Sequence, residues 1–217
     1  MPELRRLLIG DAPGAWEAAG FTVDGDHTTI GGIELAFVDG PGRGVVGWEL
    51  AGIEDDGSVD GMLTIATDRP PAAPTEHPNR VSRIDHVVIT TPDLDRTVGA
   101  LRGFGFSPRR TRDVPGTEPA RRQVFLWAGE TILEVVGPAV ATGSEPARVW
   151  GLALTSDDLD AAADLLGDRM TNPKPAIQPG RLIATVKTKD LDVAPALALM
   201  SPHVATGQAD SNETTDA

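Results

Sequence analysis

The most constraining feature of this sequence is a segment that occurs twice, 65 residues apart. Residues 84–95 read IDHVVITTPDLD, and they align without a gap on residues 149–160, which read VWGLALTSDDLD. Each copy is an apolar strand pattern that runs into residues typical of a helix start, and leucine and alanine then recur at helical spacing. The repeat therefore predicts two copies of one unit that begins with a strand and a helix.

Three extended segments follow the helix in each copy. They are 106–114, 122–127 and 131–136 in the first copy and 170–177, 182–187 and 195–200 in the second. The closing strands also correspond, now at an offset of 64, because ILEVVGP at 132–138 aligns with ALALMSP at 196–202. The unit is therefore a βαβββ module, and the predicted fold class is α+β.

A third, diverged βαβββ module is predicted at the start of the chain. Its last two strands are expected at 30–38 and 45–50, because WELAG at 48–52 resembles the closing run LEVVG at 133–137. The connection after it is expected to contain one additional strand at 62–66 and then a Pro-rich linker at 70–78. The predicted organisation is a module at 1–53, a linker at 54–81, a domain at 82–203 made of modules 82–138 and 147–203, and a disordered tail at 204–217.

The composition narrows the partners and the available chemistry. The net charge of −13 repels nucleic-acid phosphates and anionic lipid surfaces, and no apolar stretch approaches the ~20 residues of a membrane span. We therefore expect a cytoplasmic protein without a nucleic-acid or membrane partner. Because the chain has no Cys and no Tyr, titratable chemistry depends on carboxylates, three lysines and four histidines.

Two polar side chains interrupt apolar strands. His86 lies in the opening strand of module 82–138, and strand alternation turns it away from Val87 and Ile89 toward the interior. Glu134 lies in the closing strand, where an ionised carboxylate is costly unless a metal or a protonated His86 compensates it. The pair could be a metal site or a buried hydrogen-bonded pair, and the sequence leaves both open.

Further candidates for ligand binding lie on the strand 122–127 and beyond it. Gln123, Phe125 and Trp127 share one face of that strand, which suits either a pocket wall or a core surface that faces the helices. The arginines that could hold an anionic substrate, or remain solvated charges, are Arg121, Arg122 and Arg181.

The tandem pattern, with its IDHVV opening strand and LEVV closing strand, resembles the vicinal oxygen chelate superfamily of glyoxalase-like proteins. The resemblance extends over about 82–203 and, more weakly, over 3–53. It implies that two modules form a half-open eight-stranded mixed barrel around a divalent metal (Fe, Mn, Ni or Zn) and a small oxygenated or aromatic ligand. It places His86 and Glu134 at two of the four metal-ligand positions. Gly151 and Ala198 occupy the other two, and neither has a ligating side chain.

This pattern implies one of two functions. The first is a protein that binds a small molecule in its barrel and has a degenerate metal site. The second is a metal-dependent lyase, isomerase or dioxygenase in which His86 and Glu134 hold the metal and Glu134 also moves a proton. Glu49 would join these ligands if the first and second modules formed the barrel; otherwise it is a strand-edge charge that faces solvent. The unpaired first module is also predicted to form a homodimer with its counterpart in another chain.

Overall fold

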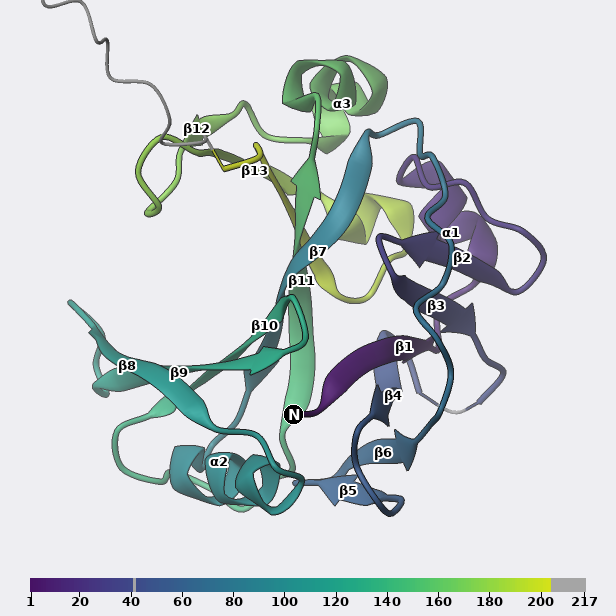
Figure 1. Cartoon of the computed structure of the whole chain (residues 1–217). Helices are drawn as coiled ribbons and strands as arrows, with labels where there is room; N and C mark the ends of the chain where they lie inside the picture. Colours follow the sequence, from purple (N-terminus) through teal and green to yellow (C-terminus); the bar gives the residue numbers. More distant parts are fainter. Residues whose placement is uncertain (41, 204–217) are drawn as a thin grey trace, which may run out of the picture.

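The structure is a computed structural model, and it describes residues 1–40 and 42–203. Its strands form two mixed sheets that lie side by side (Figure 1). The order is β2-β3-β1-β4-β6-β5 in the six-stranded sheet and β12-β13-β14-β11-β7-β10-β9-β8 in the eight-stranded sheet. The predicted α+β class is therefore confirmed. The predicted tail at 204–217 lies outside the described residues.

The eight-stranded sheet consists of two copies of the predicted βαβββ unit. The first copy is β7 (Val81–Thr90), α2 (Leu94–Gly103), β8 (Pro108–Val114), β9 (Arg121–Ala128) and β10 (Thr131–Pro138). The second is β11 (Arg148–Ser156), α3 (Leu159–Leu166), β12 (Lys174–Pro175), β13 (Leu182–Val186) and β14 (Ala196–Met200). In each copy the closing strand pairs in parallel with the opening strand, and the two opening strands, β7 and β11, pair antiparallel at the centre.

The strand register reproduces the repeat seen in the sequence. His86 is paired with Ala153, and Val88 is paired with Gly151. His86 and Gly151 are 65 residues apart, and so are Val88 and Ala153, so the repeat converts one pair into the other. An approximate two-fold axis therefore relates the two halves of the sheet. Positions that correspond in the sequence therefore correspond in space.

The eight-stranded sheet is strongly curved, but its ends do not meet. Figure 1 shows the arm β10-β9-β8 and the arm β14-β13-β12 bending toward the same side of the central strands, with α2 and α3 outside the two arms. Over the described residues the sheet ends at β8 and β12. The eight strands are thus present as predicted, in an open curved sheet and not in a closed barrel.

The two faces of this sheet differ in burial. Val87, Ile89, Leu133 and Val135 alternate along β7 and β10, are fully buried, and belong to the same core as Leu101 of α2. The side chains between them on the same strands are mostly half-exposed. We call this second face the open face. It carries His86, Val88 and Thr90 of β7 and the residues of the other strands that are paired with them.

The N-terminal sheet requires a correction to the predicted third module. The segment predicted as one strand at 30–38 contains the turn at Gly31, where φ is +64°. The strand within it is β3 (Ile33–Phe37), and β2 (His27–Ile30) precedes that turn. After β1 (Glu3–Ile9) and α1 (Pro13–Ala18), it is β3 that pairs in parallel with β1. The expected closing strand, β4 (Val45–Ala51), instead pairs antiparallel with β1 on its other side.

The strand β4 opens a further, shorter unit. It is followed by β5 (Gly57–Val59) and β6 (Met62–Ala66), and β6 pairs in parallel with β4. The additional strand predicted at 62–66 is present, together with β5. The strand β4 pairs with β1 on the side opposite to β3, so the N-terminal module has a neighbouring unit in its own chain. The homodimer stays a prediction.

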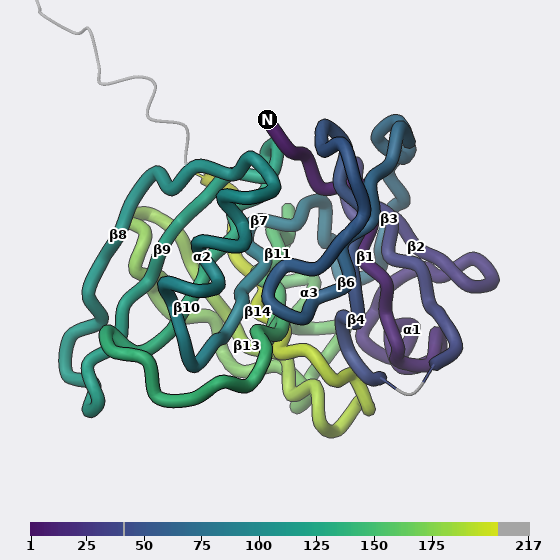
Figure 2. The backbone as a smooth tube through the Cα atoms, turned by 90° about the horizontal axis from the view of Figure 1, so that it is seen from below, coloured from purple at the N-terminus to yellow at the C-terminus, as the bar shows by residue number. Residues whose placement is uncertain are grey.

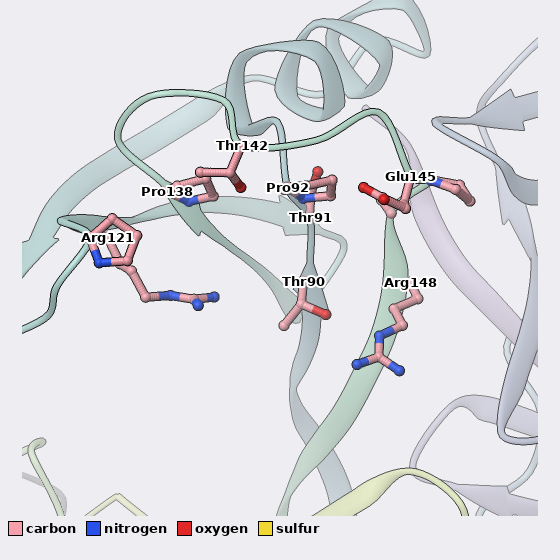
Figure 3. A pocket seen from close by; sticks show the side chains of 11 residues that line it. Thr90, Thr91, Pro92, Arg121, Pro138, Thr142, Glu145 and Arg148 are labelled. Atoms are coloured by element: carbon pink, nitrogen blue, oxygen red, sulfur yellow. The ribbon is translucent and has the colours of Figure 1, made fainter.

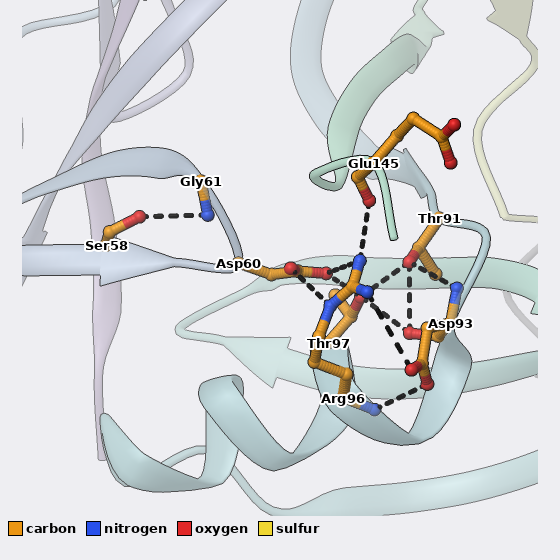
Figure 4. A network of polar contacts seen from close by, with 8 residues as sticks. All are labelled: Ser58, Asp60, Gly61, Thr91, Asp93, Arg96, Thr97 and Glu145. Carbon is orange, nitrogen blue, oxygen red and sulfur yellow. Dashed lines mark hydrogen bonds and ion pairs between the residues drawn. The ribbon is translucent and has the colours of Figure 1, made fainter. Parts of the chain in front are cut away.

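A polar network joins the six-stranded sheet to α2 (Figure 4). The Asp60 carboxylate, in the turn between β5 and β6, accepts hydrogen bonds from Arg96 Nε at 2.7 Å and from Thr97 Oγ1 at 2.5 Å. Arg96 also donates to the carbonyl oxygen of Glu145 at 2.6 Å. Figure 2 shows the resulting arrangement, with the N-terminal strands on one side of β7 and β11 and with β8, β9 and β10 on the other. Within the described residues, no helix has the length and apolar character needed to cross a bilayer.

Candidate functional site

The open face presents its side chains in rows that cross the sheet, because register-paired residues point to the same face. Successive rows lie two residues apart along each strand, roughly 6.5–7 Å. The first row is Trp127, Ile132, His86, Ala153 and Ala198; the second is Arg110, Phe125, Glu134, Val88 and Gly151; the third is Arg112, Gln123, Val136, Thr90 and Arg148. The sequence-predicted residues of β7, β9 and β10 therefore share one surface.

His86 is buried in the first row, beside a carboxylate that sequence reasoning missed. The register between β7 and β11 shifts after His86, which leaves Asp85 as the extra residue of a β-bulge. Asp85 Oδ2 lies 2.6 Å from His86 Nδ1, and neither atom has another hydrogen-bond partner among the described residues. The ring of His86 also meets Phe125 edge-on, at 6.4 Å between centroids. Regular alternation would have separated Asp85 from His86, so the sequence carries no signal for this contact.

Arg181 lies behind Asp85. Its Nη1 is 3.1 Å from Asp85 Oδ1 and 2.6 Å from Gln178 Oε1, and its Nε donates to the Ser201 carbonyl at 2.7 Å. The side chain has no exposed surface, so this guanidinium holds Asp85 in place and is not free for the predicted contact with a ligand. Burial would raise the pKa of Asp85, but the contacts with His86 and Arg181 outweigh burial and hold that pKa well below its ordinary value.

Glu134 belongs to a chain of polar contacts on the open face. Gln123 donates from Nε2 to Glu134 Oε1, and Gln123 Oε1 accepts from Arg112 Nε at 2.9 Å. The Arg112 guanidinium lies 5.9 Å from the centre of the Phe125 ring. Burial raises the pKa of Glu134, and the charges of His86 and Arg112 oppose that effect only in part. Gln123 and Phe125 thus line the open face and not the helix-packed core.

Replacing Glu134 with glutamine is expected to stabilise the protein at neutral pH. A carboxyl group whose pKa is raised in the folded state favours folding at low pH, and that contribution is lost as the pH rises through the folded pKa. Glutamine keeps the acceptor for Gln123 and removes the charge, so E134Q should unfold at a higher urea concentration than wild type at pH 7. Urea unfolding at pH 7 and pH 3 measures this difference.

The pH 3 measurement serves as the internal control, because Glu134 is then protonated in both states and the two proteins should unfold at the same urea concentration. Glu130→Gln, in the exposed turn between β9 and β10, should change neither curve. An E134Q protein that is less stable than wild type at pH 7 would contradict the assigned burial effect.

Glu49 is not brought together with His86 and Glu134. It lies on β4 of the six-stranded sheet, where its carboxylate is 2.9 Å from Arg6 Nη1 and 3.4 Å from Arg69 Nε. With 8 % of its surface exposed, it is also not the solvent-facing charge of the alternative interpretation. Its partners are Arg6 on β1 and Arg69 in the segment that follows β6.

The donor set on the open face does not fit a resident divalent metal. His86 and Glu134 supply one nitrogen and one carboxylate, and the symmetry-related positions are Gly151 and Ala198. Over residues 1–40 and 42–203, no three His, Asp or Glu side chains are grouped so that they could hold a metal ion. Protein sites for Zn and for non-haem Fe use three or four protein ligands. In addition, Glu134 is already engaged by Gln123.

A pocket of about 520 Å³ opens at one end of the open face (Figure 3). Thr90 at the end of β7, Arg148 at the start of β11 and Arg121 at the start of β9 line it, and Figure 3 shows the two arginines extending toward the same open space. Arg122 points away from this space and binds Asp113 at 2.8 Å. The sequence left the roles of three arginines undecided, and the structure separates them. Arg121 lines the pocket, Arg122 is paired with Asp113 outside it, and Arg181 is buried.

A comparison with protein families matches residues 83–180 to the family described as Glyoxalase/Bleomycin resistance protein/Dioxygenase superfamily. The matched segment spans most of the eight-stranded sheet. A search of curated proteins finds no match.

Several solved structures are similar in fold. An extradiol ring-cleaving dioxygenase from Brevibacterium fuscum aligns over 99% of this chain and 75% of its own, with 14% identity and a TM-score of 0.59. A xylose isomerase-like TIM barrel/4-hydroxyphenylpyruvate dioxygenase fusion protein aligns over 97% of this chain and 50% of its own, with 13% identity and a TM-score of 0.64. A methylmalonyl-CoA epimerase from Mycobacterium tuberculosis aligns over 58% of this chain and 91% of its own, with 18% identity and a TM-score of 0.42. At 13–14% identity, the likeness to the first two structures concerns the fold alone.

Proposed function

We propose that this chain, which belongs to the glyoxalase/bleomycin resistance/dioxygenase superfamily, binds a small oxygenated or aromatic molecule on the open face of its eight-stranded sheet. The observation that carries the proposal is the contrast between the two faces of the same strands. Side chains of one face are completely packed, whereas the open face combines aromatic rings with an imidazole, an amide and arginines. Small-molecule sites have this character, with apolar walls and a few polar groups that fix orientation.

The two halves of the open face contribute differently. In the first half, Phe125 and Trp127 supply apolar area, and 39% of Trp127 is exposed near the end of β9. In the second half, the rows continue through Ala153, Ala198 and Gly151. Ala153 and Ala198 are partly exposed and have short side chains, whereas Gly151 lies so close to Ala196 that a Cβ would not fit there.

A second candidate function is a divalent-metal-dependent lyase, isomerase or dioxygenase that uses His86 and Glu134 as ligands. It is favoured by the position of an imidazole and a carboxylate on one face of two neighbouring strands, since β7 and β10 pair directly. Two protein ligands would hold a metal weakly, so this function depends on ligands that a substrate supplies.

The metal content of the protein, prepared in metal-replete medium without chelator, separates the two candidates. We expect far less than one Fe, Mn, Ni or Zn per chain in wild type, and the same content in His86→Ala and Glu134→Ala. His27→Ala, in the six-stranded sheet, is the matched histidine control. A stoichiometric metal that disappears in both open-face variants and remains in the control would favour the metal-dependent enzyme instead.

A further inference from the structure

We propose that the ligand of the open face is an elongated anion, in which an aromatic or apolar group is joined by a short spacer to a carboxylate or phosphate held by Arg121 and Arg148. This inference rests on the proposed function and names the chemical class of its ligand. It is carried by the distribution of charge on the face, by the pocket at one end, and by the spacing between the rows.

The open face is basic, although the protein is acidic. The chain has a net charge of −13, yet the second and third rows carry three arginines and a single carboxylate, Glu134, which is hydrogen-bonded to Gln123. Arg121 adds a further positive charge in the next row. A concave basic surface on an acidic protein attracts small anions and leaves most of the remaining surface repulsive to them. The arginines of these rows are Arg110, Arg112, Arg121 and Arg148.

On β9, the arginine that faces the pocket is unpaired among the described residues, and its neighbour on the opposite face is ion-paired. Arg121 and Arg122 are neighbours, so their side chains point to opposite faces. Arg122 forms an ion pair with Asp113 at 2.8 Å, whereas Arg121 and Arg148 form no ion pair within the described part of the chain. Two arginines that face one pocket without carboxylate partners are suited to bind an anion through charge-assisted hydrogen bonds.

The pocket completes this anion site. Its lining includes Thr90, whose hydroxyl can donate to the same anion, between Arg121 and Arg148 (Figure 3). Glu145 is the one carboxylate of the described lining, so the two arginines leave the pocket with net positive charge. The volume of about 520 Å³ exceeds what a carboxylate or phosphate needs and leaves room for a spacer.

The spacing of the rows sets the length of the ligand. Arg121 and Phe125 are four residues apart on the same face of β9, roughly 13–14 Å along an extended strand. The arginine side chain shortens this distance, but a single ring with a carboxylate attached directly does not reach both ends. At the other end of the described part of the face, Arg181 and Arg83 are both ion-paired with Asp85, at 3.1 Å and 3.3 Å. The apolar group therefore lies toward Phe125 and the anionic group toward the pocket.

Calorimetric titration of the full chain with three probes tests the inference. The probes are 4-phenylbutyrate, 3-phenylpropyl phosphate and the neutral 4-phenylbutanamide. We expect at least one anionic probe to bind at least about tenfold more tightly than the amide, because charge-assisted hydrogen bonds are strong. The double variant Arg121→Gln/Arg148→Gln should reduce binding of that anion to the level of the amide. Arg122→Gln, on the same strand but the opposite face, should bind like wild type.

The outcomes separate this inference from the proposal on which it rests. The anion that binds more tightly identifies the group as a carboxylate or a phosphate. Equal binding of the amide and both anions, or an unchanged preference in the double variant, would overturn the inference and leave the binding function intact. Absence of binding by all three probes would overturn both.

Discussion

Replacing Arg181 with methionine should lower the free energy of unfolding by about 3–5 kcal/mol, the usual cost of removing one partner from a buried ion pair. The Arg181 side chain has no exposed surface, and the Asp85 side chain is 4% exposed. Methionine fills much of the same volume but leaves the Asp85 carboxylate without its buried cation; Arg83, at 3.3 Å and partly exposed, replaces it only in part. Urea unfolding at pH 7 measures the loss.

The pH dependence of that loss identifies its origin. The pKa of Asp85 is lowered in the folded protein, so ionised Asp85 contributes stability above its unfolded pKa and loses it as the pH falls. The difference in the free energy of unfolding between wild type and R181M should therefore decrease as the pH falls from 7 to 3. Arg122→Met, which breaks the exposed pair with Asp113, should lower the free energy of unfolding at pH 7 far less than R181M does. An R181M protein as stable as the R122M control would contradict the buried network.

Filling the centre of the open face should abolish ligand binding without unfolding the protein. Val88 is half-exposed in the second row, between Glu134 and Gly151, and lies between the aromatic end and the pocket. We expect Val88→Trp to weaken binding of 4-phenylbutyrate by about 100-fold, which corresponds to about 2.7 kcal/mol, because the indole occupies the space of the ligand. Calorimetric titration measures the change.

The matched control is Val140→Trp, in a loop where the valine is 79% exposed. It should bind the probe like wild type. Both variants should unfold within about 1 kcal/mol of wild type, because neither removes a packed side chain. Full binding by V88W would show that the ligand lies elsewhere.

The sequence was sufficient for the eight-stranded sheet because its repeat is long and free of gaps. A constant offset fixes which strands correspond, and the observed pairs His86–Ala153 and Val88–Gly151 follow from it. The N-terminal sheet lacked such a constraint. The turn at Gly31 joins β2 and β3, and β3 takes the place of the closing strand beside β1, which the sequence had assigned to β4.

The sequence predicted only part of the candidate site, namely the part that depends on single strands. Alternation along single strands placed His86 and Glu134 on one face, and that placement needs no knowledge of the partner strands. The contact between Asp85 and His86 depends on a bulge, which is a property of the pairing between two strands. The contact of Arg181 with Asp85 joins loops and strands 96 residues apart, and only the folded chain brings them together.

Titration of the protein with 4-phenylbutyrate, with and without EDTA, tests the central claim most directly. If the side chains of the open face bind the ligand themselves, we predict saturable binding to one site per chain, with the same affinity in both conditions and with loss of binding in V88W. Binding that appears only when a divalent metal is added, and that disappears with EDTA, would contradict the claim and assign the site to a metal held by His86 and Glu134.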